Sequence, residues 1–311
     1  MKALRVLLSE IVDYAGLFPP AGLEMVPAAD CFARYREHPE RHMLGRFVVP
    51  LGRLEELAEA AAPHLRESSS SDGAGSAESN PWPLSVLAPP TGQGALQLAS
   101  FRSEGLLPTA VEAKVSAPEQ ITEADLAFDP TLELFFEFPL DLDPKPFAAA
   151  VAAASERCRG KIRTGGITAD AIPTPAVVAD FLIACARVGA PFKATAGLHH
   201  PLRGTYRLTY EDGSPQGAMY GYLNVFLAAA LLFRGPWASQ SFEASRRKAL
   251  VEELLVETEP NAFTFENEGV AWRQWQLDLE QIEAARRDFA RSFGSCSFEE
   301  PVDDLAALEL T

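Results

Sequence analysis

The sequence of 311 residues lacks the marks of membrane-bound, secreted and disulfide-rich proteins. No uninterrupted apolar run approaches the roughly 20 residues that a membrane-spanning helix needs. A short apolar run near the start soon reaches Glu10 and Asp13 without a small-residue cleavage site, which argues against a signal peptide. The four cysteines stand far apart and form no C-x-x-C pair, as is typical of free thiols in a reducing compartment. We therefore expect a cytoplasmic protein without a membrane partner.

Positive charge is also scarce. Lys and Arg number 27 against 43 Asp and Glu, which gives a net charge of −16. Such a surface repels phosphate backbones, so we expect no nucleic-acid partner. The sequence has no G-x-G-x-x-G fingerprint, no H-x-H and no H-E-x-x-H, and it has only five histidines. We therefore expect a small-molecule substrate with no cofactor and no metal. The sequence carries no signal for an oligomeric state.

What is present is an alternation of short β-branched or aromatic runs with longer helical stretches. This pattern predicts βα units and hence a parallel sheet. Eight units in a chain of this length favour one closed (β/α)8 barrel of the TIM type, a single α/β domain over residues 1–311. The strand candidates are residues 10–16, 45–50, 84–89, 109–115, 132–138, 160–166, 191–197 and 261–267. The helix candidates are residues 24–38, 52–66, 92–104, 119–125, 144–158, 174–188, 217–233 and 275–292.

Two irregular stretches and the tail complete this organisation. Residues 67–81 are rich in Ser and Gly, so we expect a flexible loop on the lower face of the barrel. Residues 198–217 follow the seventh strand, and the alternation in TYRLTY before EDG predicts a hairpin on the upper face. Arg203 in this loop is a candidate for substrate binding. The tail, residues 293–310, is expected to pack across the outside of the barrel.

Charged residues inside the strands are the most informative feature. Alternate side chains of a barrel strand point inward, and those near its carboxyl end line the active site. Glu112 and Lys114 alternate with apolar residues that the surrounding helices should cover, so we expect both to point inward, within reach of Lys161 or Arg163. The same reasoning adds further inward candidates, which are Asp13, Arg46, Glu137, Lys193 and Thr195.

These groups predict two kinds of chemistry. A lysine among other cations and apolar walls has a depressed pKa and can form a Schiff base with a carbonyl, and Lys193 is the best candidate. Alternatively, the cations bind a carboxylate or phosphate, with Arg163 as a bidentate donor. We assign catalytic roles to Lys193, Lys161, Glu112, Lys114, Glu137 and His199. We assign substrate binding to Arg163, Thr195, Arg46, Asp13 and Arg203.

Histidine and cysteine add one candidate. His199 and His200 end the seventh strand and point in opposite directions in an extended chain, so one of them faces the site as a general acid or base. Cys296 in GSCS has no histidine or cation near it in the sequence, which gives no reason for an activated thiol.

Two six-residue segments resemble a known family. FKATAG (192–197) is similar to the seventh-strand lysine motif of deoxyribose-phosphate aldolase, and KIRTGG (161–166) resembles its sixth-strand motif. The resemblance implies a sixth-strand Schiff-base lysine whose pKa a seventh-strand lysine lowers. Arg163 stands at the Schiff-base position and Lys193 at the helper position. Because an arginine cannot form an imine, Lys161 or Lys193 would have to replace it.

Over its whole length, including DYAGLFPP and SFGSCSFEEPVDD, the chain resembles an uncharacterised bacterial protein family. We expect an enzyme that acts on a small carbonyl or carboxylate metabolite at the carboxyl-terminal mouth of the barrel, with an aldolase-like lyase as the most specific form. The alternatives are an isomerase or epimerase on the same residues, or a barrel that binds a small molecule without catalysis. Arg163 at the imine position favours the non-catalytic alternative.

Overall fold

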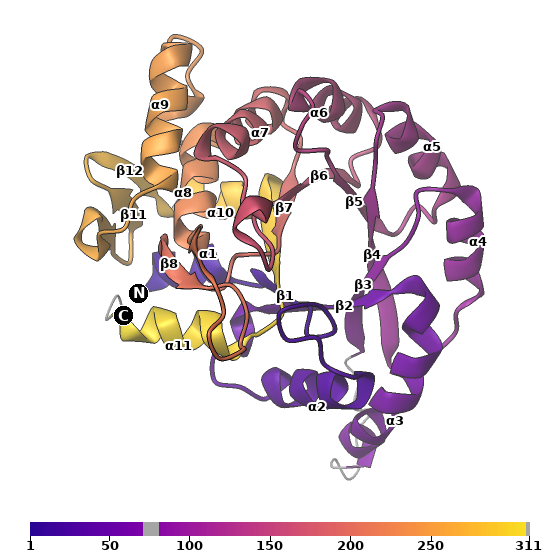
Figure 1. Cartoon of the computed structure of the whole chain (residues 1–311). Helices are drawn as coiled ribbons and strands as arrows, with labels where there is room; N and C mark the ends of the chain where they lie inside the picture. The colour runs from indigo at the N-terminus through magenta and orange to yellow at the C-terminus, as the bar shows by residue number, and fades with distance from the viewer. Residues whose placement is uncertain (71–80, 309–311) are drawn as a thin grey trace.

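A computed structural model describes residues 1–70 and 81–308 of the chain, with backbone alone for residues 66–70. Eight parallel strands close into a barrel in the order β1-β13-β7-β6-β5-β4-β3-β2, with helices around it (Figure 1). This confirms the predicted (β/α)8 architecture. The barrel strands are β1 (Val12–Tyr14), β2 (Leu44–Pro50), β3 (Trp82–Leu87), β4 (Leu106–Lys114), β5 (Glu133–Glu137), β6 (Cys158–Arg163), β7 (Phe192–Thr195) and β13 (Ala290–Ser295).

Helices cover the outer face of the barrel because they bury apolar stripes against the strands, and α9 packs outside them on α7 and α8. In α7, for example, Val178, Phe181, Leu182 and Cys185 are buried, and Gly189 ends the helix with a φ of 69°. The helices are α1 (Lys2–Leu8), α2 (Met25–Arg36), α3 (Leu54–Ser70), α4 (Gly92–Ser100), α5 (Glu119–Ala127), α6 (Pro144–Ala153), α7 (Pro175–Val188), α8 (Tyr222–Phe233), α9 (Ala244–Leu255), α10 (Leu279–Asp288) and α11 (Glu299–Ala307).

By length and composition alone, one stretch of the described residues, Ala169–Val188, could cross a membrane. Its chain is divided between a short 3-10 turn (Ala169–Ala171) and α7. The apolar side of α7 belongs to the core of the barrel. We therefore read α7 as a helix of the barrel wall.

The eighth strand is not where the sequence predicts it. Residues 261–267 contain β10 (Phe263–Phe265), which pairs antiparallel with β11 (Gly269–Trp272), itself paired with β12 (Trp275–Asp278), in a separate sheet. The strand that closes the barrel is β13, which the sequence analysis divided between a helix and an outer tail. Its residues ARSFGS look unlike a strand because one face meets the polar interior of the barrel, where Ser292 bonds to Asp13.

Other boundaries also differ from the predictions. The expected flexible loop at 67–81 is wrong for residues 67–70, which continue α3, and residues 71–80 lie outside the described part of the chain. β8 (Gly204–Arg207) and β9 (Gln216–Met219) pair antiparallel and form the hairpin that the alternation predicts, and the second strand continues past residue 217, where a helix was expected. The hairpin lies beside α11 in Figure 1, and the hydroxyl of Tyr210 donates to Glu300 over 3.0 Å.

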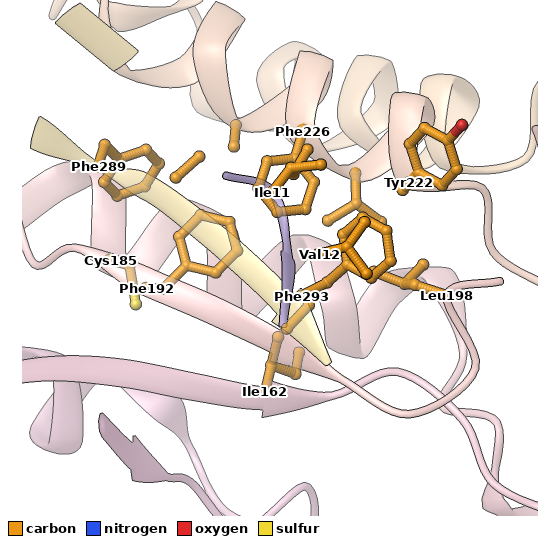
Figure 2. Packing of buried hydrophobic residues seen from close by; sticks show 14 of the residues in the cluster. Ile11, Val12, Ile162, Cys185, Phe192, Leu198, Tyr222, Phe226, Phe289 and Phe293 are labelled. Atoms are coloured by element: carbon orange, nitrogen blue, oxygen red, sulfur yellow. The ribbon is translucent and has the colours of Figure 1, made fainter. Parts of the chain in front are cut away.

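Aromatic packing holds β13 in the barrel. Phe293 on β13 stacks on Tyr222 of α8 with ring centroids 5.2 Å apart and contacts Phe226 one turn further on (Figure 2). Phe192 on the neighbouring strand β7 packs against Phe289, which directly precedes β13. All these rings are fully buried, so the closing strand is fixed mainly by its outer face.

We predict that Phe293→Ala lowers the free energy of unfolding by about 3–5 kcal/mol, because it leaves a cavity between β13 and α8. The matched control is Leu126→Ala on α5, where the side chain is 84% exposed and its loss should cost less than about 0.5 kcal/mol. Urea unfolding of both variants measures the difference. Similar values for the two would show that β13 does not close the barrel.

Candidate active site

A cavity of about 720 Å³ lies at the carboxyl ends of the barrel strands, and we call it the upper cavity. Apolar residues of several βα loops form part of its wall, among them Phe18, Pro19 and Ile167. The predicted candidates that line it are Glu112, Lys114, Glu137, Lys161, Arg163, Thr195 and His199. The structure thus brings these seven predicted residues together around one cavity.

A continuous row of buried ion pairs runs through the barrel interior. Lys193 Nζ donates to Asp13 Oδ2 over 2.5 Å and to Glu112 Oε1 over 2.6 Å. Lys161 Nζ lies 2.8 Å from Glu112 Oε2 and 2.9 Å from Glu137 Oε2. We call the five residues Asp13, Lys193, Glu112, Lys161 and Glu137 the ion-pair chain. All five are buried.

The strand register creates this arrangement. Glu137 pairs with Lys161 across β5 and β6, and Lys161 pairs with Lys193 across β6 and β7. Three charged side chains therefore stand at one level on three adjacent strands. Glu112 reaches them from β4 and accepts a hydrogen bond of 2.7 Å from Ser85 on β3. The hydroxyl group of Ser85 therefore helps the opposite charges to hold Glu112 in the ion-pair chain.

The carboxylates and ammonium groups of the ion-pair chain stabilise each other's charged forms. Burial alone would raise the pKa of Glu112, but the ammonium groups of Lys161 and Lys193 hold it well below its usual range. Burial alone would lower the pKa of Lys161, yet the charges of Glu112 and Glu137 raise it above its ordinary value. Lys161 is therefore an ammonium group at neutral pH.

The prediction that cations surround Lys193 is wrong. The sequence analysis placed this lysine among cations, whereas two carboxylates hold it, because Asp13 and Glu112 reach it from β1 and β4. Lys193 is 0% exposed and does not line the upper cavity. Its ammonium lies 5.2 Å from the centroid of the Phe135 ring. Of these two lysines, Lys161 lines the upper cavity and Lys193 does not.

The rim of the upper cavity carries two further cations around Glu137. Arg163 Nε lies 3.4 Å from Glu137 Oε1, and its side chain is 39% exposed. Lys114 Nζ lies 4.0 Å from the same oxygen atom, and its side chain is 77% exposed. Thr195 pairs with Arg163 in the register of β6 and β7. Both cations are therefore partly exposed beside Glu137 in the lining of the upper cavity.

Three predicted substrate-binding residues lie elsewhere. Arg46 stands early in β2, toward the opposite end of the barrel, and bonds to Glu133 over 2.5 Å and to Thr109 over 2.9 Å. Asp13 lies beneath the upper cavity, paired with Lys193. Arg203 stacks on the ring of Tyr220 at 4.6 Å and does not line the upper cavity. A position inside the barrel or in an upper loop is not enough to place a side chain in the upper cavity. The height of the residue along the barrel axis also decides whether it reaches the cavity.

The sequence analysis missed a group around His199. Cys296, directly after β13, lines the upper cavity with its Sγ 4.0 Å from His199 Nδ1 and 3.5 Å from the hydroxyl of Tyr210. Glu300 Oε2 lies 3.0 Å from the same Nδ1 atom. No pattern in the sequence indicates this group, because residues 261–267 were predicted as the eighth strand. The strand that closes the barrel, β13, ends directly before Cys296 and brings it beside His199.

His199 is charged at neutral pH. Burial lowers its pKa, but Cys296 and Glu300 outweigh this effect and raise it to about 10. His200 turns away from the cavity and stacks on Tyr206 with ring centroids 3.4 Å apart. Among the described residues no three His, Cys, Asp or Glu side chains are grouped as a metal site requires.

We predict that Lys193→Met lowers the free energy of unfolding by about 3–5 kcal/mol at pH 7, because the carboxylates of Asp13 and Glu112 stay buried without their shared cation. Lys114→Met is the matched control, and its exposed pair with Glu137 should cost less than about 1 kcal/mol. Guanidinium unfolding compares the two. Equal stability of both variants would contradict a buried ion-pair chain.

We also predict that the stability contributed by His199 depends on pH. Its pKa is about 10 in the folded protein and about 6.5 in the unfolded chain, so its contribution is complete below pH 6.5 and disappears as the pH rises toward 10. The stability difference between the wild type and His199→Gln should therefore shrink by a few kcal/mol between pH 6 and pH 10. Denaturant unfolding across this range measures it, and a constant difference would refute the charged state.

Comparison with known proteins adds little to this picture. No family model matches the chain, and no curated protein matches it. A search of solved structures finds the apo-form crystal structure of a "putative deoxyribose-phosphate aldolase" from Toxoplasma gondii ME49, with a TM-score of 0.40 and 10% identity. The match covers 99% of this chain and 96% of that one. At this similarity we draw no conclusion about activity from the match, and the closed barrel rests on the strand pairing itself.

Proposed function

We propose that the chain is an enzyme that acts on a small carbonyl metabolite in the upper cavity, with Lys161 as the group that engages the carbonyl. One observation supports this above all: a buried lysine lines an otherwise partly apolar cavity and lies 2.8–2.9 Å from two carboxylates. Ionisable groups that are buried at such cost and still reach a cavity are typical of catalytic sites.

The most specific form of the proposal is an aldolase-like lyase. The neutral amine of Lys161 adds to the substrate carbonyl and forms an imine with release of water. The ammonium proton of Lys161 goes to solvent, because Glu112 and Glu137 have pKa values below their usual range and do not take it up. The protonated imine accepts the electron pair of the cleaved carbon–carbon bond, while the hydroxyl on the departing carbon loses its proton to water and leaves as a carbonyl product. Water then hydrolyses the remaining adduct and frees Lys161. Lys193 would act as a positioning residue, because its ammonium fixes Glu112 against Lys161. The apolar wall would limit access of water to the imine.

A second candidate is an isomerase, which the raised pKa of Lys161 favours. As an ammonium group, Lys161 would donate a hydrogen bond to the carbonyl oxygen and stabilise an enolate. Glu137 would remove the proton from the adjacent carbon. In both candidates Arg163 at the rim and His199 in the wall of the upper cavity would hold a carboxylate of the substrate. The lyase and the isomerase differ in one testable respect, the covalent bond to Lys161.

We predict that borohydride traps an adduct on Lys161 when the protein is incubated with a panel of small aldehydes and 2-oxo acids. Intact mass reads the addition and peptide mapping locates it. Lys161→Arg should abolish the adduct, whereas the control Lys114→Arg should keep it, because Lys114 is exposed at the rim. Both variants retain the positive charge, so the comparison isolates the nucleophilic amine.

Three outcomes separate the candidates. An adduct that disappears only in Lys161→Arg supports the lyase. Exchange of substrate protons with solvent deuterium, without an adduct and lost in Lys161→Gln, supports the isomerase. Neither adduct nor exchange with any compound of the panel would contradict the enzyme proposal and leave the barrel as a binding protein.

A further inference from the structure

A second cavity lies at the opposite end of the barrel from the candidate active site. It measures about 590 Å³, and we call it the lower cavity. Four arginines line it, together with the buried residues Asp13 and Ser292 of the barrel interior. The arginines are Arg46, Arg286, Arg287 and Arg291. Such a concentration of cations is unexpected in a chain whose net charge is −16.

Carboxylates around the lower cavity pair with three of its four arginines. Glu133 alone accepts Arg46, Arg159 and Arg291, at 2.5, 2.5 and 3.3 Å. Asp13 is already engaged by Lys193 and Ser292. Glu10 and Glu283 also line the cavity, but in the described part of the chain neither forms an ion pair with an arginine. Arg287 pairs with Asp288 over 2.8 Å, which leaves Arg286 as the arginine of this cavity without a carboxylate partner among the described residues.

Arg286 is the clearest sign of a missing anion. Its Nη atoms donate to backbone carbonyls of Ser9, Ala290 and Arg291, and no carboxylate pairs with it among the described residues. Its Nε is buried and has no hydrogen-bond partner there. Burial and the nearby charge of Arg291 lower the pKa of Arg286 to about 9. A buried guanidinium in this state is costly unless an anion comes to it.

We propose that the lower cavity is a binding site for a small dianionic phosphate group, separate from the candidate active site. Several guanidinium groups converging on one space offer the paired N–H donors that match phosphate oxygens. The volume exceeds that of a phosphate ion, so a small phosphomonoester also fits. The acidic surface of the chain disfavours a nucleic acid as the source of this phosphate.

The phosphate site does not depend on the proposed carbonyl chemistry, but a row of ion-paired side chains links the two cavities. Asp13 lines the lower cavity and begins the ion-pair chain, which ends at Lys161 and Glu137 in the upper cavity. A phosphate at the lower end would therefore sit one ion pair away from Lys193. This connection places the anion site and the candidate active site on one electrostatic network.

Calorimetric titration with inorganic phosphate, at constant ionic strength set with chloride, tests the proposal on the full chain. We expect saturable binding with one site per chain and a phosphate-dependent rise in Tm of about 2 °C at tenfold excess over Kd. Arg291→Gln and Arg287→Gln should each weaken binding roughly tenfold, by loss of a charged hydrogen bond. Arg287 has a side chain that is 68% exposed, so its replacement leaves the fold intact.

Two controls locate the binding. Arg163→Gln removes a cation from the upper cavity, and Arg246→Gln removes the same charge from the exposed surface of α9, and both should keep wild-type affinity. Loss of binding in Arg163→Gln alone would assign the phosphate to the upper cavity and overturn the proposal. Equal weakening by all four variants, or no saturable binding, would also overturn it. Tighter binding of glycerol 3-phosphate than of inorganic phosphate would identify a phosphomonoester as the ligand class.

Discussion

The ammonium of Lys193 between the carboxylates of Asp13 and Glu112 is the interaction on which the barrel interior depends. These three side chains come from β7, β1 and β4, and they meet only when the barrel is closed. A buried ion pair stabilises little compared with an apolar replacement of equal volume, but breaking it is costly. The fully buried ammonium of Lys193 also fixes Glu112 beside the lysine of the upper cavity.

The same interaction divides the barrel into two ends. Above it, Lys161 is shared by Glu112 and Glu137 and faces a cavity with apolar walls. Below it, Asp13 borders a cavity that four arginines line. The upper end has a buried lysine that lines the cavity between two carboxylates, and the lower end has one arginine, Arg286, without a carboxylate partner among the described residues. The ion-pair chain thus connects the upper cavity with the lower cavity.

The alternation of charged and apolar residues predicted much of the candidate site. It identified Glu112, Lys161 and Arg163 as inward side chains, since their strand neighbours had to be covered by helices. It could not rank them by height along the barrel axis, because height depends on the stagger between strands. That is why Arg46 was expected in the upper cavity, although it lies at the lower one.

By itself, the sequence determined the class of fold, the seven strands that begin the barrel and the face on which their charges lie, because these features follow from patterns within single segments. Only the tertiary structure decided which segment closes the barrel, which lysine meets the cavity and that Cys296 lies beside His199. Asp13 and Lys193 are 180 residues apart in the chain. No local pattern encodes such a contact, because it exists only once the eighth strand joins the first to the seventh and the inward side chains are forced to share one interior.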